Sequence, residues 1–340
     1  KHGRQSPGRP AAALFYAASI PEGDSIRVFS PLVVEQTANR PPEAGKQQDV
    51  WNIVVHSSRI QTLDLRNVVD GAGLPWKAAM WGSEHDVRLL GSVRRRYESF
   101  EEFCDSVGLA HAQGFELRAA EASESVDPIP ELAGKPLLKM DRMRDCGAIF
   151  EFPHDALVPI ETDLANLRVR GGRSGLDVSL PPHIIVDEAR RFAVYCDEFI
   201  AVPPRQIGIS GSSSQASLLK ALSLYLVSDF AKYHQFLTTP QWGISTSIAT
   251  RRSLGELPVL FWEFADSEIA DWAGLHDRIV QAARAEEDAD SLFPRDVTES
   301  ESLAPLLAEL NDRVFHALRL GDFERVLVRD LVHLRMRLIQ

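Results

Sequence analysis

The sequence is poor in cysteine and has no long apolar run. Its three cysteines, Cys104, Cys146 and Cys196, are widely separated and form no Cys-x-x-Cys pair. This spacing indicates neither a disulfide framework nor a zinc cluster, and it favours a reducing, cytoplasmic setting. No apolar run approaches the roughly 20 residues that cross a bilayer, and the first residues are not a signal peptide. We therefore expect a cytoplasmic protein with no membrane partner.

The common catalytic signatures are also missing. The chain has no Gly-x-Ser-x-Gly, no His-Glu-x-x-His and no compact Asp…Glu-x-Lys cluster, which are the patterns of hydrolases, zinc proteases and nucleases. The ten histidines are scattered. We therefore assign no catalytic, cofactor-binding or metal-binding residue. An enzyme whose active site is built from scattered loop residues is a less favoured alternative to a binding function.

The acidic residues are concentrated in one part of the chain. The formal net charge is −11, and residues 261–312 hold 14 acids against 3 bases. Residues 161–260 are nearly neutral, with 10 bases and 9 acids, and residues 313–340 hold 6 arginines and 3 acids. An acidic protein is a poor DNA binder if its charge is spread evenly, whereas a bipolar one can present a basic face to DNA.

Short apolar segments predict a sheet in the second half of the chain. The apolar run 192–202 predicts a strand, and residues 207–209 form a second apolar patch ahead of a Gly-Ser loop. Further short segments precede this run: 148–152, 157–160, 167–169 and 184–186. Proline, glycine and histidine separate them, as in a mixed sheet. Near the start, strands are expected at 12–18, 25–30 and 51–56.

A long helix is expected after the Gly-Ser loop. Ser213 or Ser214 is a suitable N-cap, because its hydroxyl can accept a bond from a free N–H of the first turn. Apolar residues then recur at spacings of three and four: Leu219, Leu222, Leu226, Phe230 and Tyr233. Such residues share one face of a helix. Earlier, helices are expected at 86–96 and 99–107, the latter with a Ser99–Glu102 capping box.

The last 78 residues, 263–340, predict helices. One apolar stripe runs from Leu303 to Leu318 and another from Phe323 to Leu338. Two such stripes favour an antiparallel helix pair. The fold class is therefore predicted as α/β (α+β), a mixed-sheet domain followed by a helical C-terminal region.

Residues 192–260 also carry a suggestive order of motifs. A strand is followed by a leucine-rich helix, then by Phe236-Leu-Thr, Trp242-Gly-Ile and Leu257-Pro. This order resembles the target-recognition region of bacterial adenine-N6 DNA methyltransferases from restriction–modification and related phage-defence systems. Two other regions are similar to segments of the same family: 51–55 with 76–82, and 310–315 with 320–325 and 328–332.

The resemblance implies a division of the chain into four segments. Residues 1–48 are expected to be the last hairpin of a methyltransferase domain, or an edge hairpin of the domain that follows. Residues 49–131 would be a mixed connecting segment. By composition, residues 39–48 and 119–131 are linkers. Residues 132–262 would form the target-recognition domain, and 263–340 the helical region.

The catalytic motifs of that family are absent. The family uses a Gly-rich loop for S-adenosylmethionine and an Asn/Asp-Pro-Pro-Tyr/Phe tetrapeptide for a flipped adenine. Asn39-Arg-Pro-Pro42 has an extra residue and no aromatic, and Gly208-Ile-Ser-Gly211 is not Gly-x-Gly-x-x-Gly. The resemblance thus implies a fragment that binds double-stranded DNA, with S-adenosylmethionine held by a separate methyltransferase catalytic domain or subunit.

The DNA-binding candidates are defined by their chemistry and by their position near the motifs that resemble this family. They are Arg168, Arg170, Arg173, Arg205, Lys232, Tyr233, Gln235, Arg251 and Arg252. The Arg168–Arg173 loop, with two glycines, can offer guanidinium groups to phosphate or guanine; an ordinary surface loop with incidental arginines is equally compatible. Trp242 either wedges against DNA or fills the core beneath its loop.

Two further alternatives remain at this level. The cluster Arg94-Arg95-Arg96-Tyr97 either tracks a phosphate backbone or is a solvated helix end. The whole chain, with its acidic 261–312 segment, is alternatively a non-catalytic protein-interaction or scaffold module of a defence complex. Binding to DNA that weakens steeply with salt would favour the first function over the second.

Overall fold

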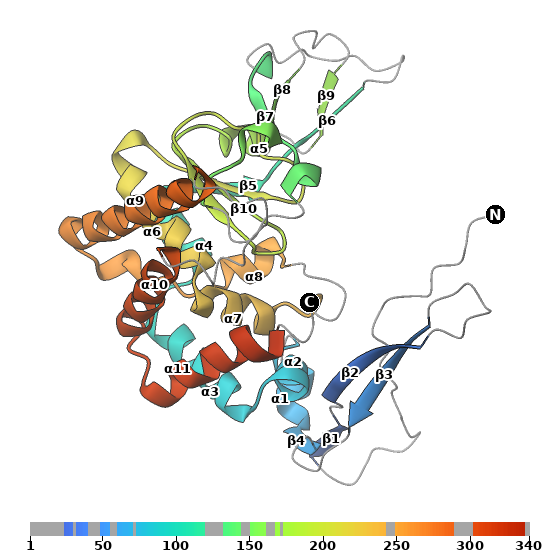
Figure 1. Ribbon diagram of the computed structural model, residues 1–340. Coiled ribbons are helices and arrows are strands. Elements are labelled where there is room, and N and C mark those ends of the chain that lie inside the picture. Colours follow the sequence, from blue (N-terminus) through green and yellow to red (C-terminus); the bar gives the residue numbers. More distant parts are fainter. Residues whose placement is uncertain are drawn as a thin grey trace. The chain divides into compact units, whose positions relative to one another are not determined.

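The computed structural model (Figure 1) describes residues 24–29, 32–39, 48–54, 60–70, 73–119, 132–143, 150–160, 167–170, 173–242, 249–288 and 302–336. In these ranges the chain is a mixed α+β protein with antiparallel strands and several helices, including C-terminal ones. The expected fold class is confirmed. None of the described helices is both long and apolar enough to cross a membrane.

The chain folds into two compact units, each assembled from separate segments. Unit 1 comprises Lys1–Ser92, Phe236–Ser247 and Asp322–Gln340, and unit 2 comprises Val93–Gln235 and Ile248–Gly321. These units do not follow the four consecutive segments expected from the sequence. The difference has a physical reason, because a compact unit is defined by packing, and packing joins segments that are distant in the chain.

Unit 1 contains two antiparallel strand pairs. β1 (Ser25–Phe29) pairs with β4 (Ile60–Asp64), and β2 (Leu32–Asn39) pairs with β3 (Gln48–Val54). The predicted strand at 25–30 is confirmed as β1, and that at 51–56 overlaps β3. The predicted strand at 12–18 and most of the predicted linkers lie outside the described residues.

Unit 1 also contains an aromatic cluster and several helices. The helices are α1 (Leu65–Asp70), α2 (Leu74–Trp81), α11 (Asp322–Asp330), the π-helical turn η8 (Leu331–Arg335) and the first part of α3 (Glu84–Arg96). The Phe236 ring packs edge-on against Trp81 and Trp242, at centroid distances of 6.1 and 5.8 Å. Trp242 is buried. It therefore fills the core, and its alternative role as a wedge against DNA is wrong.

The two helices predicted after residue 84 are confirmed as α3 and α4 (Phe100–Val107). The Ser99 hydroxyl accepts from Glu102 N at 3.3 Å, and Ser99 N donates to the Glu102 carboxylate at 2.9 Å. This is the expected capping box, and it satisfies two of the N–H groups that the first turn leaves free.

A four-stranded antiparallel sheet forms the centre of unit 2. Its order is β11 (Ala193–Cys196), β10 (His183–Val186), β12 (Ile207–Ser210) and β5 (Ala110–Gln113). Strand β11 is shorter than the predicted run 192–202, because the polar pair Asp197-Glu198 follows it. Every residue of β10 and β12 is buried, so both faces of the sheet are covered.

Helices and loops cover the two faces. α6 (Ala216–Val227) packs on β10 and β11, and α9 (Asp266–Asp288) packs on α6. On the other face, the side chains of Ile185, Val194 and Ala112 join one apolar cluster with Leu138, Met143, Phe152, Ala156 and Val178. That side includes β7 (Pro136–Leu138) paired with β8 (Leu157–Pro159), and the short helices η3 (Met140–Met143) and η4 (His154–Ala156).

The predicted long helix is in fact two helices, α6 and α7 (Asp229–Thr238), separated at Ser228. Ser228 has an extended backbone (φ −64°, ψ 158°), and its hydroxyl accepts from Ala231 N at 3.3 Å, as an N-cap does. Ser213 and Ser214 are not the N-cap of α6; they lie in the preceding turn η5 (Ser213–Gln215), which Ser212 and Gln215 cap.

The apolar stripe of α10 (Leu303–Ala317) packs on α9 and α6 within unit 2. Leu310, Val314 and Phe315 are buried there. The stripe is therefore covered without the predicted antiparallel pairing to the next helix. The remaining elements are β6 (Glu116–Ala119) paired with β9 (Leu167–Arg170), α5 (Arg173–Asp177), α8 (Arg251–Gly255) and η6 (Phe261–Glu263).

Candidate nucleic-acid interface

Several arginine-bearing segments meet at one end of the central sheet. The register pairs Val186 with both Ala193 and Ile207, and Ile207 with Gln113. Strands β10 and β5 therefore end where β11 and β12 begin. The turn 187–192, the turn 203–206 and the connection from β5 to the β6–β9 ribbon all leave the sheet at this place. We call this set of segments, together with α8, the arginine end.

Main-chain hydrogen bonds hold these segments together. Gly114 N donates to Gln206 O at 2.9 Å, and Glu188 N donates to the Gln206 side chain at 2.8 Å. On its other side, Glu188 O accepts from Ala249 N at 2.9 Å. The turn that carries Arg205 and the start of α8 are thus both fixed to residue 188.

A close backbone approach requires glycine at position 114. A Cβ added there would lie 2.3 Å from the carbonyl oxygens of Val202 and Pro203. Such distances are far below van der Waals contact, and neither neighbour is a flexible side chain. Gly114 therefore allows the β6–β9 ribbon to leave the sheet directly beside the turn 203–206.

The buried side chain of Arg190 connects this end of the sheet to the helices α7 and α8. Its guanidinium donates to Asp187 O at 2.9 Å, to Thr250 O at 3.1 Å and to the Gln235 side-chain oxygen at 3.2 Å. Arg190 is 3 % exposed and lies in the left-handed region, with φ 56°. Burial lowers the pKa of Arg190 to about 10, so the group is still charged at neutral pH.

Two of the predicted DNA contacts are buried and are corrected: Gln235, which belongs to this network, and Tyr233. Gln235 is 1 % exposed, accepts from Arg190 and Ser253, and donates to Ser253 O. Tyr233, on the same helix α7, is fully buried. Neither side chain reaches the surface, so neither can contact DNA in this conformation. Lys232 is half-buried, and burial lowers its pKa against the opposing effect of Asp229.

The exposed candidates lie on both sides of the network. Arg205 is exposed in its turn with φ 73°, and Arg251 and Arg252 are exposed in the first turn of α8. Arg252 forms a surface ion pair with Glu256 at 3.1 Å. Arg251 is close enough to His111 to contribute to the lowering of its pKa, which is caused first by burial.

The other three candidates belong to the ribbon and to α5. Arg168 and Arg170 are residues of β9, where they pair with Arg118 and Glu116 of β6. Arg173 is the first residue of α5, which packs on β5. Residues 171 and 172, between them, lie outside the described residues. The backbone thus brings these positions to the arginine end, together with Arg205 and α8.

Sequence reasoning missed three arginines at this end: Arg118, Arg190 and Arg191. Arg191 donates to the Asp187 carboxylate at 2.8 Å and is partly exposed. The adjacent pair Arg190-Arg191 directly before an apolar strand did carry a signal for this end. A turn there must direct the two side chains differently, so one of them can be buried while the other is exposed.

The opposite end of the sheet carries acids. Asp197 and Glu198 directly follow β11, and Asp177 O accepts from Ser210 Oγ at the end of β12. The arginine end also contains acids, since Asp187 and Glu188 lie in its turn 187–192 and Asp187 pairs with Arg191. Arginines outnumber these acids there, and such a local surplus can present a positive surface even though the net charge of the chain is −11.

The described part of the chain offers little for metal binding or thiol chemistry. No group of three His, Cys, Asp or Glu residues there could hold a metal ion. Cys104 and Cys196 are buried, and burial raises the pKa of the Cys104 thiol to about 12 and that of Cys196 further. Neither is a reactive thiolate. Cys146 lies outside the described residues.

Comparison with known proteins identifies no family for this chain. No protein-family model matches the chain. A search of curated proteins finds no match either.

Proposed function

We propose that this chain is the DNA-binding target-recognition region of an S-adenosylmethionine-dependent adenine-N6 DNA methyltransferase of a restriction–modification or phage-defence system. The observation that carries the proposal is the convergence of Arg205, α8 and the β6–β9 ribbon at one end of a rigid sheet. The order of motifs in residues 192–260, which resembles that enzyme family, supports it further.

The buried network gives the arginine end the rigidity that recognition needs. Arg190 and Gln235 fix the start of α8 from within, so Arg251 and Arg252 project from a held helix. Guanidinium groups on fixed backbone can contact phosphates and set the register on a duplex. Arginines that reach a base edge would discriminate guanine by bidentate hydrogen bonds.

The chemistry of methyl transfer is assigned to a partner. The sequence has neither the Gly-rich cofactor loop nor the catalytic tetrapeptide of that family, so a methyltransferase domain or subunit would hold S-adenosylmethionine and the flipped adenine. The contribution of this chain would be to bind and orient double-stranded DNA.

The test is salt-dependent binding of a fluorescein-labelled mixed-sequence duplex, measured by fluorescence anisotropy. Replacing Arg205 and Arg251 together by alanine should reduce the slope of log affinity against log salt by about 2, because each phosphate contact contributes roughly 0.9. A second pair, Arg168→Ala with Arg173→Ala, tests the ribbon and α5 in the same way.

The matched control is Arg27→Ala with Arg88→Ala, which removes two exposed arginines of unit 1. The control should keep the wild-type slope. If the Arg205/Arg251 double variant bound DNA with the wild-type affinity and slope, or if the control lost as much, the assignment of the arginine end would be wrong.

A second candidate function is a non-catalytic protein-interaction or scaffold module of a defence complex. One observation favours it: an acid-rimmed groove between α9 and α10, which DNA would avoid. The two functions are compatible in one chain, since the groove and the arginine end are built from different elements of unit 2.

A further inference from the structure

Three residues other than glycine have a positive φ in the described part of the chain, and all three are arginines. They are Arg190 with φ 56°, Arg205 with φ 73° and Arg319 with φ 54°. Residues with a Cβ rarely adopt this left-handed conformation, and those that do are most often Asn, Asp or His. Such a conformation persists where surrounding contacts hold it, and it is enriched at functional sites.

Two of these arginines have a structural reason for their conformation. The guanidinium of Arg190 is buried and joins three segments. Arg319 follows the last turn of α10, where its N–H donates to His316 O at 2.9 Å and Leu320 N donates to Phe315 O at 2.9 Å. A left-handed residue is common at such a helix end, and the negative end of a helix favours a cation.

Arg205 lies in a turn that normally contains glycine at its position. Gln206 N donates to Pro203 O at 3.3 Å and closes a β-turn, in which Pro204 is the second residue and Arg205 the third. A proline in the second position and a positive φ in the third are the features of a type II turn, whose third residue is normally glycine or asparagine. Arginine there costs conformational energy that glycine would avoid.

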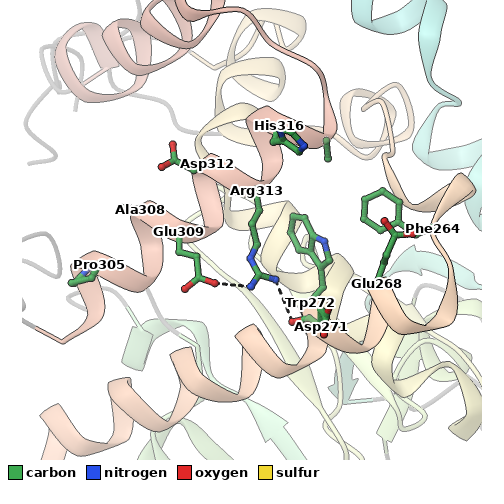
Figure 2. A pocket seen from close by; sticks show the side chains of 11 residues that line it. Phe264, Glu268, Asp271, Trp272, Pro305, Ala308, Glu309, Asp312, Arg313 and His316 are labelled. Carbon is green, nitrogen blue, oxygen red and sulfur yellow. Dashed lines mark hydrogen bonds and ion pairs between the residues drawn. The ribbon is translucent and has the colours of Figure 1, made fainter.

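The side chain of Arg205 adds no contact that would offset this cost. It is exposed, and it forms no hydrogen bond or ion pair with another described residue. Arg313, in the groove between α9 and α10, shows the contrasting case (Figure 2). It donates to Glu309 at 2.6 Å and to the main-chain oxygen of Asp271 at 3.4 Å. The fold therefore explains Arg313 and does not explain Arg205.

The turn that carries Arg205 is held firmly on both sides. Before it, Val202 O accepts from Phe115 N at 3.1 Å. After it, the buried side chain of Gln206 accepts from Glu188 N at 2.8 Å. Two consecutive prolines stiffen the chain between these bonds, because each ring fixes φ. Arg205 therefore leaves the surface from a fixed point of the backbone.

We infer that Arg205 reads a guanine in the major groove of the bound duplex, by donating two hydrogen bonds to its O6 and N7 atoms. This inference rests on the proposed function. A phosphate contact needs only a cation within reach, which Arg251 and Arg252 supply from an unstrained helix. A bidentate contact needs a guanidinium of defined position and orientation, which the anchored turn provides.

A guanidinium in the groove also lies close to phosphates, so its charge still releases counterions. The reduced salt slope expected for alanine at position 205 is therefore compatible with reading a base. Arg205→Lys separates the two effects. Lysine keeps the charge and should keep the salt slope, but it cannot form the planar bidentate contact.

The first experiment uses a pool of duplexes with a fully randomised central segment. The pool is selected by repeated binding to the intact chain and then sequenced. The wild type should enrich a motif that contains a guanine, and Arg205→Lys should enrich the same motif without a preference at that position.

The second experiment tests the contact at a single atom of the enriched duplex. Replacing the guanine by 7-deazaguanine removes the N7 acceptor and keeps the base pair. The wild type should bind the substituted duplex at least about fivefold more weakly, whereas Arg205→Lys should bind both duplexes equally. Equal binding of both duplexes by the wild type would overturn the inference.

Two control variants separate this role from charge and from folding. Arg88→Lys, on the exposed surface of α3 in unit 1, should enrich the wild-type motif. Arg205→Gly should lose the guanine preference, yet unfold at the same urea concentration as the wild type or at a higher one, because glycine adopts φ 73° without strain. A lower midpoint would show that the arginine stabilises the turn, and the argument from strain would be wrong.

The failure of this inference differs from the failure of the proposed function. A chain that binds duplexes with the expected salt dependence, but enriches no guanine that depends on Arg205, would overturn the assignment of Arg205 to a base and leave the proposed function standing. A chain that binds no duplex would overturn both.

Discussion

Arg190 and Lys77 are cations that the fold places inside, and they serve different purposes. Arg190 uses its planar group to join three carbonyl or amide oxygens from different segments, which a lysine could not reach at once. Lys77 has a simpler environment. Its ammonium donates to Thr239 O at 3.2 Å and lies 4.2 Å from the centroid of the Phe236 ring.

The burial of Lys77 makes a prediction about pH. Burial lowers the pKa of Lys77 from 10.5 to about 8. Between these values the unfolded chain holds a proton that the folded chain has lost, so raising the pH through this window favours the folded state. Below about pH 8 both states are protonated and the contribution is constant.

Lys77→Met, which keeps an apolar stem against Phe236, should remove this dependence. The difference in unfolding free energy between wild type and variant should rise by up to about 1.4 kcal/mol per pH unit between pH 8 and 10.5. Urea unfolding of both proteins at several pH values measures it. Buried tyrosine and cysteine groups titrate in the same range but cancel in the difference. A constant difference would contradict the prediction.

At the residue scale, the sequence predicted local features better than burial. The Ser99–Glu102 capping box is a short-range pattern and was found. Gln235 and Tyr233 were chosen as polar side chains near a recognition loop, yet both are inside. The apolar stripe that ends at Tyr233 already indicated burial of this residue. It marks only one face of α7, however, and Gln235 is not part of it. Nothing in the spacing shows that α8 and the turn 187–192 would cover the polar face as well.

At the scale of elements, the central sheet depends on one small residue. Gly208 of β12 lies beneath Val178, and a Cβ added there would be 2.6 Å from its Cγ2 and 2.8 Å from its main-chain oxygen. Val178 belongs to the apolar cluster that covers this face. Larger side chains are excluded because the face has no space to spare.

A pair of alanine substitutions tests this packing. Gly208→Ala should lower the unfolding free energy by about 1–3 kcal/mol, because the sheet or Val178 must shift. Gly274→Ala, in the exposed interior of α9 with no heavy atom within 4 Å of the added Cβ, should raise it by about 0.5–1 kcal/mol. Chemical unfolding of both variants gives the answer, and a neutral Gly208→Ala would refute the close contact.

The break between α6 and α7 is a helix boundary that apolar spacing does not predict. Apolar spacing continues through Ser228 as if the helix were unbroken, so the periodicity alone predicts one helix. The sequence Ser228-Asp229 does carry a signal, since serine is a favoured N-cap and an acid is favoured in the first turn. Ser and Asp are common enough that this signal acquires weight only with tertiary contacts, such as Asp229 N donating to Asn311 at 2.8 Å.

For the whole molecule, the acidic C-terminal helices are part of a core rather than an appendage. Trp272, Leu275 and Ile279 of α9 are buried, and α9 packs on α6. The sequence divided the chain at residue 262, where the charge changes. Unit 2 crosses that position, because apolar packing rather than charge determines which segments fold together.

Removing residues 263–340 should therefore expose the apolar side of α6 and cause aggregation. Size-exclusion chromatography with light scattering, with the full-length chain as reference, measures this. A soluble, monomeric product with cooperative unfolding would instead show that the C-terminal helices fold as an independent domain.

The bonding of the arginine end has a consequence for how its specificity could evolve or be redesigned. Its segments are tied by main-chain bonds through Gly114, Gln206 and Glu188, whereas Arg205 and Arg251 point outward from these ties. Exposed side chains here can be exchanged singly while the scaffold keeps its shape. A transplanted loop, in contrast, would bring only one of several surfaces that come from distant parts of the chain. New binding preferences at this end can therefore be reached by point substitutions, but not by replacing one whole loop.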